Sequence, residues 1–207
     1  MRLEKEMSFL KMYKKTILAP GIVLYRTGSE SVNGLKDEIN QSVPTQEWKE
    51  AQVVNLETFE GQLHESRKCH DFVLYDHNEE LKGLYKKIDN WISPAFNDFM
   101  QEYNVEPIVS DMYLILRYGN LGKFDSHVDD GGKFPRTVSL SAYINEDYEG
   151  GELEFKHFNI KHKPQTGDII LFSSAFPYMH SVAPVTSGTR YAIVNWYRYS
   201  TYPKEIL

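Results

Sequence analysis

The strongest constraint on the fold of this chain is a run of short apolar segments, separated by glycines, in its C-terminal half. The expected strands are 111–118, 123–128, 136–145, 152–157, 168–173, 179–182 and 189–199. No helical pattern interrupts them, and glycine turns such as 119–122 and 150–151 lie between them. Many short strands at regular spacing predict a sandwich or a jelly-roll barrel.

The region before these strands contains the clearest helical pattern. Between residues 79 and 103, apolar side chains recur at the spacing of one helix face. Asp76 and Glu79 have the spacing of a capping box, and Pro94 predicts a kink or the start of a second helix. The order of elements favours a mainly β protein, a jelly-roll or cupin-like barrel buttressed by N-terminal helices.

Composition indicates one globular domain. The 207 residues suffice for one sizeable core, and 41% hydrophobic and 25% charged residues are ordinary values. We expect a single domain over 1–207, with a helical and mixed support region at 1–107 and the β-core at 108–200. The formal net charge of −6 argues against nucleic acid as a partner.

Location and redox state are also constrained. No apolar run reaches the roughly 20 residues of a membrane span, and lysines interrupt the N-terminal segment where a signal peptide would be apolar. We therefore expect a cytoplasmic protein without a membrane partner. The single cysteine, Cys69, excludes an internal disulfide. Nothing in the sequence indicates the oligomeric state.

Three residues of the β-region are of types that bind metal ions. His127 and Asp129 are two residues apart, so on an extended strand their side chains project from the same face. His-x-Asp alone is a weak signal, but His180 follows later in the same region. Two histidines and one carboxylate form the facial triad of non-haem iron oxygenases, which leaves positions on Fe(II) open. Arg190 could hold a carboxylate of a further ligand through paired hydrogen bonds.

Two-residue alternation predicts where side chains point. In the expected strand 136–145, Ser139 and Ser141 share one face, and apolar residues form the other. We expect the apolar face to pack under the helix and the polar face to line the barrel, with a solvent-facing edge as the alternative for this strand alone. An inward Arg190 requires an inward Trp196, because both lie on one strand face.

The order and spacing of these motifs resemble the prolyl 4-hydroxylase branch of the 2-oxoglutarate/Fe(II) dioxygenases. The matching blocks are LRYG at 116–119, HVD at 127–129, AYIN at 142–145, EGGEL at 149–153, GDIILF at 167–172, HSVAPV at 180–185 and GTRYAIVNWY at 188–197. The resemblance implies a double-stranded β-helix in which His127, Asp129 and His180 bind Fe(II) and Arg190 binds 2-oxoglutarate. The further cofactor-binding residues that it implies are Tyr118, Tyr143, Trp196 and Thr189.

The same resemblance implies an activity. It is the hydroxylation of an unactivated C–H bond with O2 as the other cosubstrate, release of succinate and CO2, and ascorbate in a supporting role. The favoured substrate is a prolyl residue in a peptide or protein, and a free amino acid or small metabolite is the alternative. Asp129 favours hydroxylation, since related halogenases have a small residue there. A cupin-like metal-binding protein and a degenerate, non-catalytic module are the rival functions.

Several loops and two further histidines also carry expectations. Loops at 69–78, 130–135 and 174–178 are expected to contact the substrate. His157 and His162 are expected on a surface hairpin rather than in a second metal site.

Overall fold

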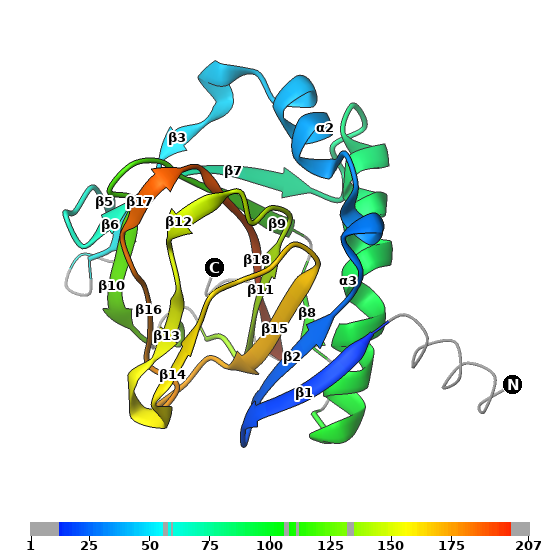
Figure 1. Cartoon of the computed structure of the whole chain (residues 1–207), viewed down its shortest axis with the longest axis vertical. Helices are drawn as coiled ribbons and strands as arrows, with labels where there is room; N and C mark the ends of the chain where they lie inside the picture. The colour runs from blue at the N-terminus through cyan, green and yellow to red at the C-terminus, as the bar shows by residue number, and fades with distance from the viewer. Residues whose placement is uncertain are drawn as a thin grey trace, which may run out of the picture.

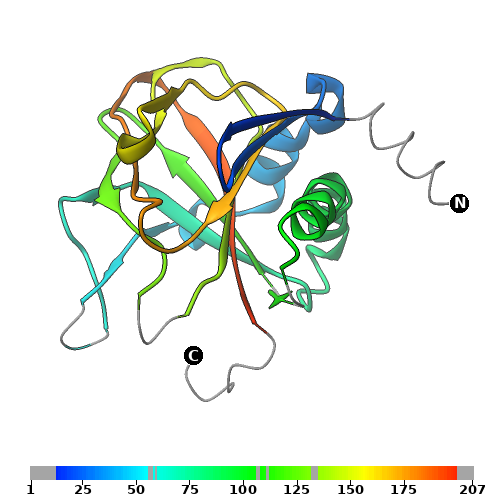
Figure 2. The same ribbon diagram turned by 90° about the horizontal axis from the view of Figure 1, so that it is seen from below.

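The computed structural model describes residues 13–55, 58, 60–105, 108–110, 112–131 and 135–199. Within them the chain forms two facing β-sheets that enclose a barrel, and both α-helices lie on the side of the larger sheet (Figure 1). Figure 2 shows the same arrangement from below. The expected jelly-roll barrel with N-terminal helices is therefore confirmed.

The larger sheet joins strands from the whole length of the chain. Its strands are, in spatial order, β1 (Lys14–Ala19), β2 (Ile22–Arg26), β15 (Asp168–Ser173), β11 (Val138–Tyr143), β18 (Arg190–Tyr199), β9 (Met112–Tyr118), β7 (His70–Tyr75) and β3 (Lys49–Glu50), with β8 (Ile108–Val109) also paired to β18. The segment expected as a loop at 69–78 is thus largely β7, which pairs with β9 through main-chain hydrogen bonds.

The smaller sheet faces the larger one across the barrel. Its strands are β14 (Ile160–His162), β13 (Leu153–Phe155), β16 (His180–Val182), β10 (Lys123–His127) and β6 (Arg67–Lys68). Two further pairs are β12 (Tyr148–Gly150) with β17 (Val185–Gly188), and β4 (Val53–Val54) with β5 (Gly61–Gln62). Most of these strands are very short, which explains why the pattern of the sequence does not reveal several of them.

Alternation along the strands divides the apolar side chains between two cores. On β15, Ile169 and Leu171 belong to the core under the helices, whereas Ile170 and Phe172 belong to the core between the sheets. Neighbouring residues point to opposite faces because the side-chain period of a strand is two. The apolar face of β11 packs on the helix side, as its alternation predicts.

The helices cover the outer face of the larger sheet. They are α2 (Leu35–Ser42) and α3 (Lys82–Glu102), with short 3-10 turns η1 (Ser29–Val32), η2 (Thr45–Glu47) and η3 (Lys156–Phe158). The expected capping box is wrong, because α3 begins at Lys82 and the Oδ1 of Asn78 accepts the N–H of Leu81 at 3.2 Å. A second helix does not start at Pro94 either. Burial of Trp91 and Ala95 on either side keeps one helix in place through the proline.

The hairpin with His162 and the loop at 130–135 are two further segments with an expectation from the sequence. The hairpin of β13 and β14 carries His162, whose Nε2 lies 2.8 Å from Asp168 Oδ2, so this side chain is mostly buried and pairs with a carboxylate. Arg26 binds the same carboxylate. Residues 132–134 of the expected loop at 130–135 lie outside the described part. In the described part, no helix combines the length and the apolar composition needed to cross a membrane.

Candidate active site

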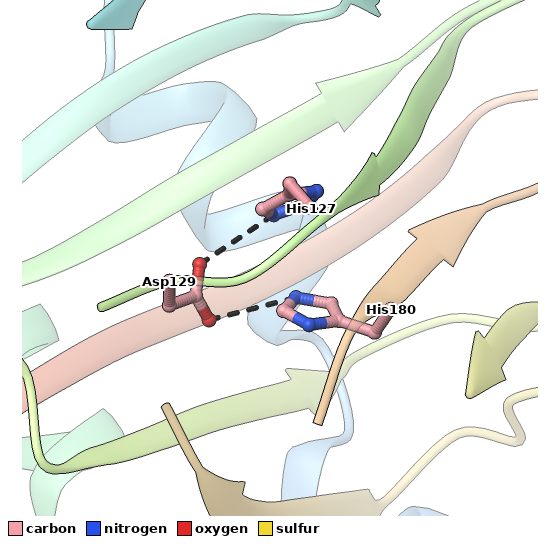
Figure 3. A group of neighbouring side chains, drawn as sticks. All are labelled: His127, Asp129 and His180. Carbon is pink, nitrogen blue, oxygen red and sulfur yellow. Dashed lines mark ion pairs between the residues drawn. The ribbon is translucent and has the colours of Figure 1, made fainter. Parts of the chain in front are cut away.

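The smaller sheet brings the two candidate histidines together. β10 and β16 are antiparallel neighbours, and His127 is directly opposite His180 in their register. Asp129 follows the end of β10, and its N–H donates to the carbonyl of Ser174 at 3.1 Å. Figure 3 shows the three side chains pointing toward one another from these two strand ends.

The donor atoms of the three side chains converge. His127 Nε2 lies 3.5 Å from Asp129 Oδ1, and His180 Nε2 lies 3.5 Å from Asp129 Oδ2. One donor atom from each residue can be chosen so that all lie within 4.8 Å of one another. This spacing and this donor set, two imidazoles and one carboxylate, fit an Fe(II) ion bound on one face.

Backbone carbonyls orient both imidazole rings. The Nδ1 of His127 lies 2.8 Å from the carbonyl oxygen of Asp125, and the Nδ1 of His180 lies 3.2 Å from that of Tyr178. A carbonyl oxygen can only accept, so each Nδ1 carries the hydrogen and each Nε2 keeps its lone pair for a metal ion. Hydrogen bonds of this kind commonly fix the tautomer of metal-binding histidines.

The charge states also suit a metal ion. Burial alone would raise the pKa of Asp129, but His180, His127 and a 2.6 Å hydrogen bond from Ser139 outweigh it and hold that pKa well below its ordinary value. Burial lowers the pKa of His180 to about 4. At neutral pH the cluster therefore offers an ionised carboxylate and a neutral imidazole, and neither has to lose a proton before a metal ion binds.

Arg190 lies at the start of β18, opposite Tyr118 on β9, and is only 1% exposed. Its guanidinium carbon lies 4.8 Å from the ring centre of Tyr118 and 5.0 Å from that of Tyr143. Its Nε and Nη1 are buried without a hydrogen-bond partner, and no carboxylate of the described residues forms an ion pair with it. A buried cation in this state is costly, so the position fits a carboxylate ligand.

Three tyrosines surround this guanidinium. Burial raises the pKa of Tyr118 and of Tyr143 above the ordinary value, so both phenols keep their protons and can donate hydrogen bonds. Tyr148 on β12 is the third, and its buried hydroxyl has no hydrogen-bond partner. Its position depends on the pairing of β12 with β17, which is why no sequence motif identifies it.

The close approach of the backbone to Arg190 explains why the second glycine of the EGGEL block, Gly151, is a glycine. Its φ is +67°, and a Cβ there would lie 2.8 Å from Cδ of Arg190. Only glycine combines that backbone conformation with so close an approach. This residue therefore lets the chain pass against the side chain of Arg190.

The remaining expected site residues occupy different positions. Trp196 lines the same cavity as the three clustered residues and Arg190, as the alternation along β18 predicts. Thr189 is half-buried just before β18, and its carbonyl accepts a hydrogen bond from Asn145 at 2.7 Å. Its side chain is not among those that line the cavity.

A barrel that brings two histidines, a carboxylate and an unpaired arginine to one cavity defines a class of jelly-roll proteins built around a metal ion and an anionic ligand. The comparison with protein families is more specific, since residues 113–198 match the model of the 2OG-Fe(II) oxygenase superfamily. These residues form a 2OG-Fe(II) oxygenase domain, and the resemblance seen in the motifs is confirmed. Proteins of this superfamily use Fe(II), 2-oxoglutarate and O2.

Curated relatives carry related names. The chain is 27% identical over 158 residues to a putative prolyl 4-hydroxylase of Acanthamoeba polyphaga mimivirus, covering 60% of this chain and 64% of that protein. It is 33% identical over 118 residues to a PKHD-type hydroxylase of Pseudomonas fluorescens, covering 51% and 49%. The chain thus spans about half to two thirds of the length of these relatives.

Solved structures share the fold. A prolyl hydroxylase from Trichoplax adhaerens, in complex with a hypoxia inducible factor peptide fragment, aligns with a TM-score of 0.67 and 18% identity over 95% of this chain and 89% of that chain. A prolyl-4-hydroxylase from Pseudomonas putida aligns with a TM-score of 0.65 and 19% identity over 86% and 93%. At these identities the likeness supports the architecture alone.

Proposed function

We propose that this protein is an Fe(II)- and 2-oxoglutarate-dependent dioxygenase that hydroxylates a prolyl residue in a peptide or protein and releases succinate and CO2. The observation that carries the proposal is the cavity itself. It combines a convergent His127, Asp129 and His180 cluster with the unpartnered guanidinium N–H groups of Arg190. The name of the mimivirus relative, a putative prolyl 4-hydroxylase, supports the choice of a prolyl substrate.

Each residue has an assigned role in this proposal. His127, Asp129 and His180 hold the iron, and Arg190 binds the far carboxylate of 2-oxoglutarate, assisted by the hydroxyls of Tyr118 and Tyr143. Trp196 completes the proposed set of cosubstrate-binding residues at the cavity, and Thr189 supports that set from outside the cavity through the hydrogen bond that its carbonyl accepts from Asn145. When bound, iron and 2-oxoglutarate supply the oxidising chemistry that O2 alone cannot perform on a C–H bond. We also propose that the chain acts as one domain, because strands from both halves form the larger sheet.

In this proposal, the protein orients the metal-binding side chains and shields the cavity from water. The carbonyls of Asp125 and Tyr178 hold the two imidazoles so that Nε2 faces the centre. Ser139 donates to Asp129 Oδ2 and limits the rotation of the carboxylate. Apolar side chains between the sheets exclude water from the cavity, which strengthens the attraction between Arg190 and a carboxylate.

The test uses purified protein without oxygen. Addition of Fe(II) and 2-oxoglutarate should produce a weak visible charge-transfer band, and admission of O2 should remove the band and release succinate. Asp129→Ala should abolish both signals, because it removes the only carboxylate of the cluster. Asp125→Asn is the matched control, since this exposed side chain pairs with Lys123 and its backbone carbonyl is retained.

Two results would contradict the proposal. Metal-loaded, folded protein that gives neither band nor succinate would favour a cupin-like metal-binding protein or a non-catalytic module. Normal succinate release by Asp129→Ala would remove the metal assignment. A prolyl peptide that gains the mass of one oxygen would support the substrate class.

A further inference from the structure

The described residues contain four buried side-chain polar atoms without a hydrogen-bond partner, and three of them belong to two arginines that line the same cavity. Two of these atoms are on Arg190, which the proposed function assigns to 2-oxoglutarate. The third is Nε of Arg67, which has no role in that function. Arg67 lines the cavity together with the metal-binding cluster, so its unused N–H group points to a second ligand there.

Arg67 is held in a fixed orientation. It lies on β6 opposite Phe124 of β10, and its guanidinium carbon lies 4.8 Å from the centre of the Phe124 ring. That ring is in turn stacked on His127 with 3.7 Å between ring centres. The Nη1 of Arg67 donates to the carbonyl of Gln52 at 2.9 Å. Stacking and one hydrogen bond therefore fix the plane of the guanidinium beside the proposed iron site.

The charge of Arg67 is not neutralised by an ion pair. Its polar neighbours include Tyr118, Cys69 and Asp71. In the described part of the chain, however, no carboxylate lies within ion-pair distance of Arg67, although such pairs are found for many surface lysines. A guanidinium in this state favours an anionic partner, and the carboxylate is the anion whose two oxygens match its paired N–H groups.

A second guanidinium lies near Arg67. Arg136 is stacked on Trp196, with 4.0 Å from its guanidinium carbon to the ring centre, and Trp196 lines the cavity. Its Nη1 donates to the backbone carbonyl of Asp129 at 3.3 Å. Burial lowers the pKa of Arg136, and Arg67 lowers it further, whereas Asp129 and Asp130 act in the opposite direction. Two cations that repel each other would both be stabilised by one anion.

Arg67 also stands where a substrate would enter. Besides the cavity, it lines a more open neighbouring cleft of about 510 Å³, together with Leu63, His64 and Lys68. Its side chain is only partly exposed, so it forms the boundary between the cleft and the cavity. A group bound there would be adjacent to the metal-binding cluster without occupying it.

We propose that Arg67 is a substrate-binding residue that takes a carboxylate of the substrate at the entrance of the cavity, with Arg136 as the second cation. The inference rests on the proposed function and narrows its substrate to an anionic proline derivative. The carboxylate is either that of a terminal or free proline or the side chain of an acidic residue beside the proline. A neutral peptide carbonyl accepts hydrogen bonds but leaves the charge of Arg67 without compensation, whereas Arg136 already lies 4.0 Å from a carboxylate oxygen of Asp129.

Two pairs of compounds that differ in one charge test this inference. N-acetyl-L-proline is compared with N-acetyl-L-prolinamide, and the dipeptide N-acetyl-prolyl-glutamate, amidated only at its α-carboxyl group, is compared with its glutamine counterpart. Binding is measured by calorimetry on protein loaded with Fe(II) and 2-oxoglutarate without oxygen, so that no turnover is needed. The variants are Arg67→Gln, Arg67→Lys and the control Lys161→Gln, which removes an exposed charge of the same sheet that lines neither the cavity nor the cleft.

The expected result is a preference of about tenfold or more for the charged member of one pair. The first pair identifies a terminal carboxylate and the second an acidic side chain. Arg67→Gln should lose the preference, Arg67→Lys should keep part of it, and Lys161→Gln should keep all of it. The affinity for 2-oxoglutarate should be unchanged in Arg67→Gln.

Three results would overturn the inference. In the first, wild-type protein binds none of the four compounds or does not distinguish the members of either pair. In the second, Arg67→Gln keeps the preference for the charged compound. In the third, Arg67→Gln lowers only the affinity for 2-oxoglutarate. Succinate release after admission of O2 is measured in parallel. Succinate without charge preference leaves the proposed function intact, whereas folded protein without succinate contradicts the proposed function itself.

Discussion

The two faces of the larger sheet differ in what they bury. Its outer face shares one apolar core with α3, in which Val138 and Leu140 of β11 are buried together with Ile88 and Ile92 of the helix. Its inner face also buries Ser139, whose hydroxyl binds Asp129, and Arg190, whose Nε and Nη1 lack hydrogen-bond partners. The same strands therefore supply a dry core on one side and a polar, incompletely paired surface on the other.

The outer face of the larger sheet therefore contributes mainly to stability, and the inner face contributes mainly to ligand binding. Close apolar packing on the outer face contributes to the free energy of unfolding without touching a ligand. Unpaired polar groups on the inner face lower that free energy until a ligand binds them. Substitutions on the two faces are therefore expected to have opposite effects on the ligand-free protein.

The largest expected effect comes from Arg190→Met on the inner face. The dissociation constant for 2-oxoglutarate should rise about 1000-fold, because a buried charged contact is lost. The ligand-free protein should become more stable by about 1–3 kcal/mol, because an unpaired buried charge is removed. Calorimetry and thermal denaturation measure the two quantities. Arg198→Met, on the same strand but only partly buried, is the control, and a less stable Arg190→Met would contradict this reading of the inner face.

The outer face should respond in the reverse manner. Ile88 is fully buried between α3 and the sheet, so Ile88→Ala should lower the free energy of unfolding by about 3 kcal/mol. The affinity of the folded protein for 2-oxoglutarate should stay within about twofold of wild type, since ΔΔG values of well-separated sites are usually additive. Denaturant titration and calorimetry provide the measurements. Lys87→Ala, an exposed change on the same helix, should be close to neutral.

Acidification should affect the metal-binding cluster next, through His180 on the smaller sheet. The pKa of His180 is about 4 in the folded protein, below its ordinary 6.5, so the unfolded chain binds the proton first. This contribution to stability is present above pH 6.5 and is lost as the pH falls toward 4. Between pH 7 and pH 5 the metal-free protein should lose about 2 kcal/mol. Denaturant titrations at both pH values test this, and an equal loss in His180→Gln would assign the effect to other groups.

The smallest effect is expected at the turn behind Arg190. Gly151→Ala places a methyl group against Cδ of Arg190 at a positive φ. We expect about tenfold weaker binding of 2-oxoglutarate and a loss of about 1 kcal/mol in stability, because the guanidinium must shift. Gly119→Ala is the matched control, as a Cβ there meets no atom within 4 Å. Unchanged binding in Gly151→Ala would mean that Arg190 tolerates the displacement.

Much of this arrangement can be predicted from the sequence, for identifiable reasons. Strands such as β9 and β15 are continuous apolar runs bounded by turn residues, and the bounds expected for β15 agree with the structure. His127, Asp129 and His180 can be grouped in advance because their residue types and order match a known donor set. Their convergence confirms the grouping, and their role as ligands stays a prediction.

The features that could not be predicted depend on contacts between distant segments. Arg67 lies in a polar stretch without a motif, and its place in the cavity follows from the pairing of β6 with β10. Tyr148 reaches Arg190 only through the position of β12. The start of α3 was mispredicted, and of the two outcomes expected at Pro94 the second helix does not occur, because burial against the sheet outweighs local signals for capping and breaking.

The direct pairing of His127 with His180 has a consequence for the mechanics of the barrel. These residues are far apart in the chain but opposite each other on β10 and β16, two short strands on the side of the barrel away from the α-helices (Figure 1). An ion shared by both side chains would act as a reversible cross-link that closes the intervening chain into a loop. Metal occupancy would thus set the rigidity of the smaller sheet, in addition to enabling the reaction in the cavity.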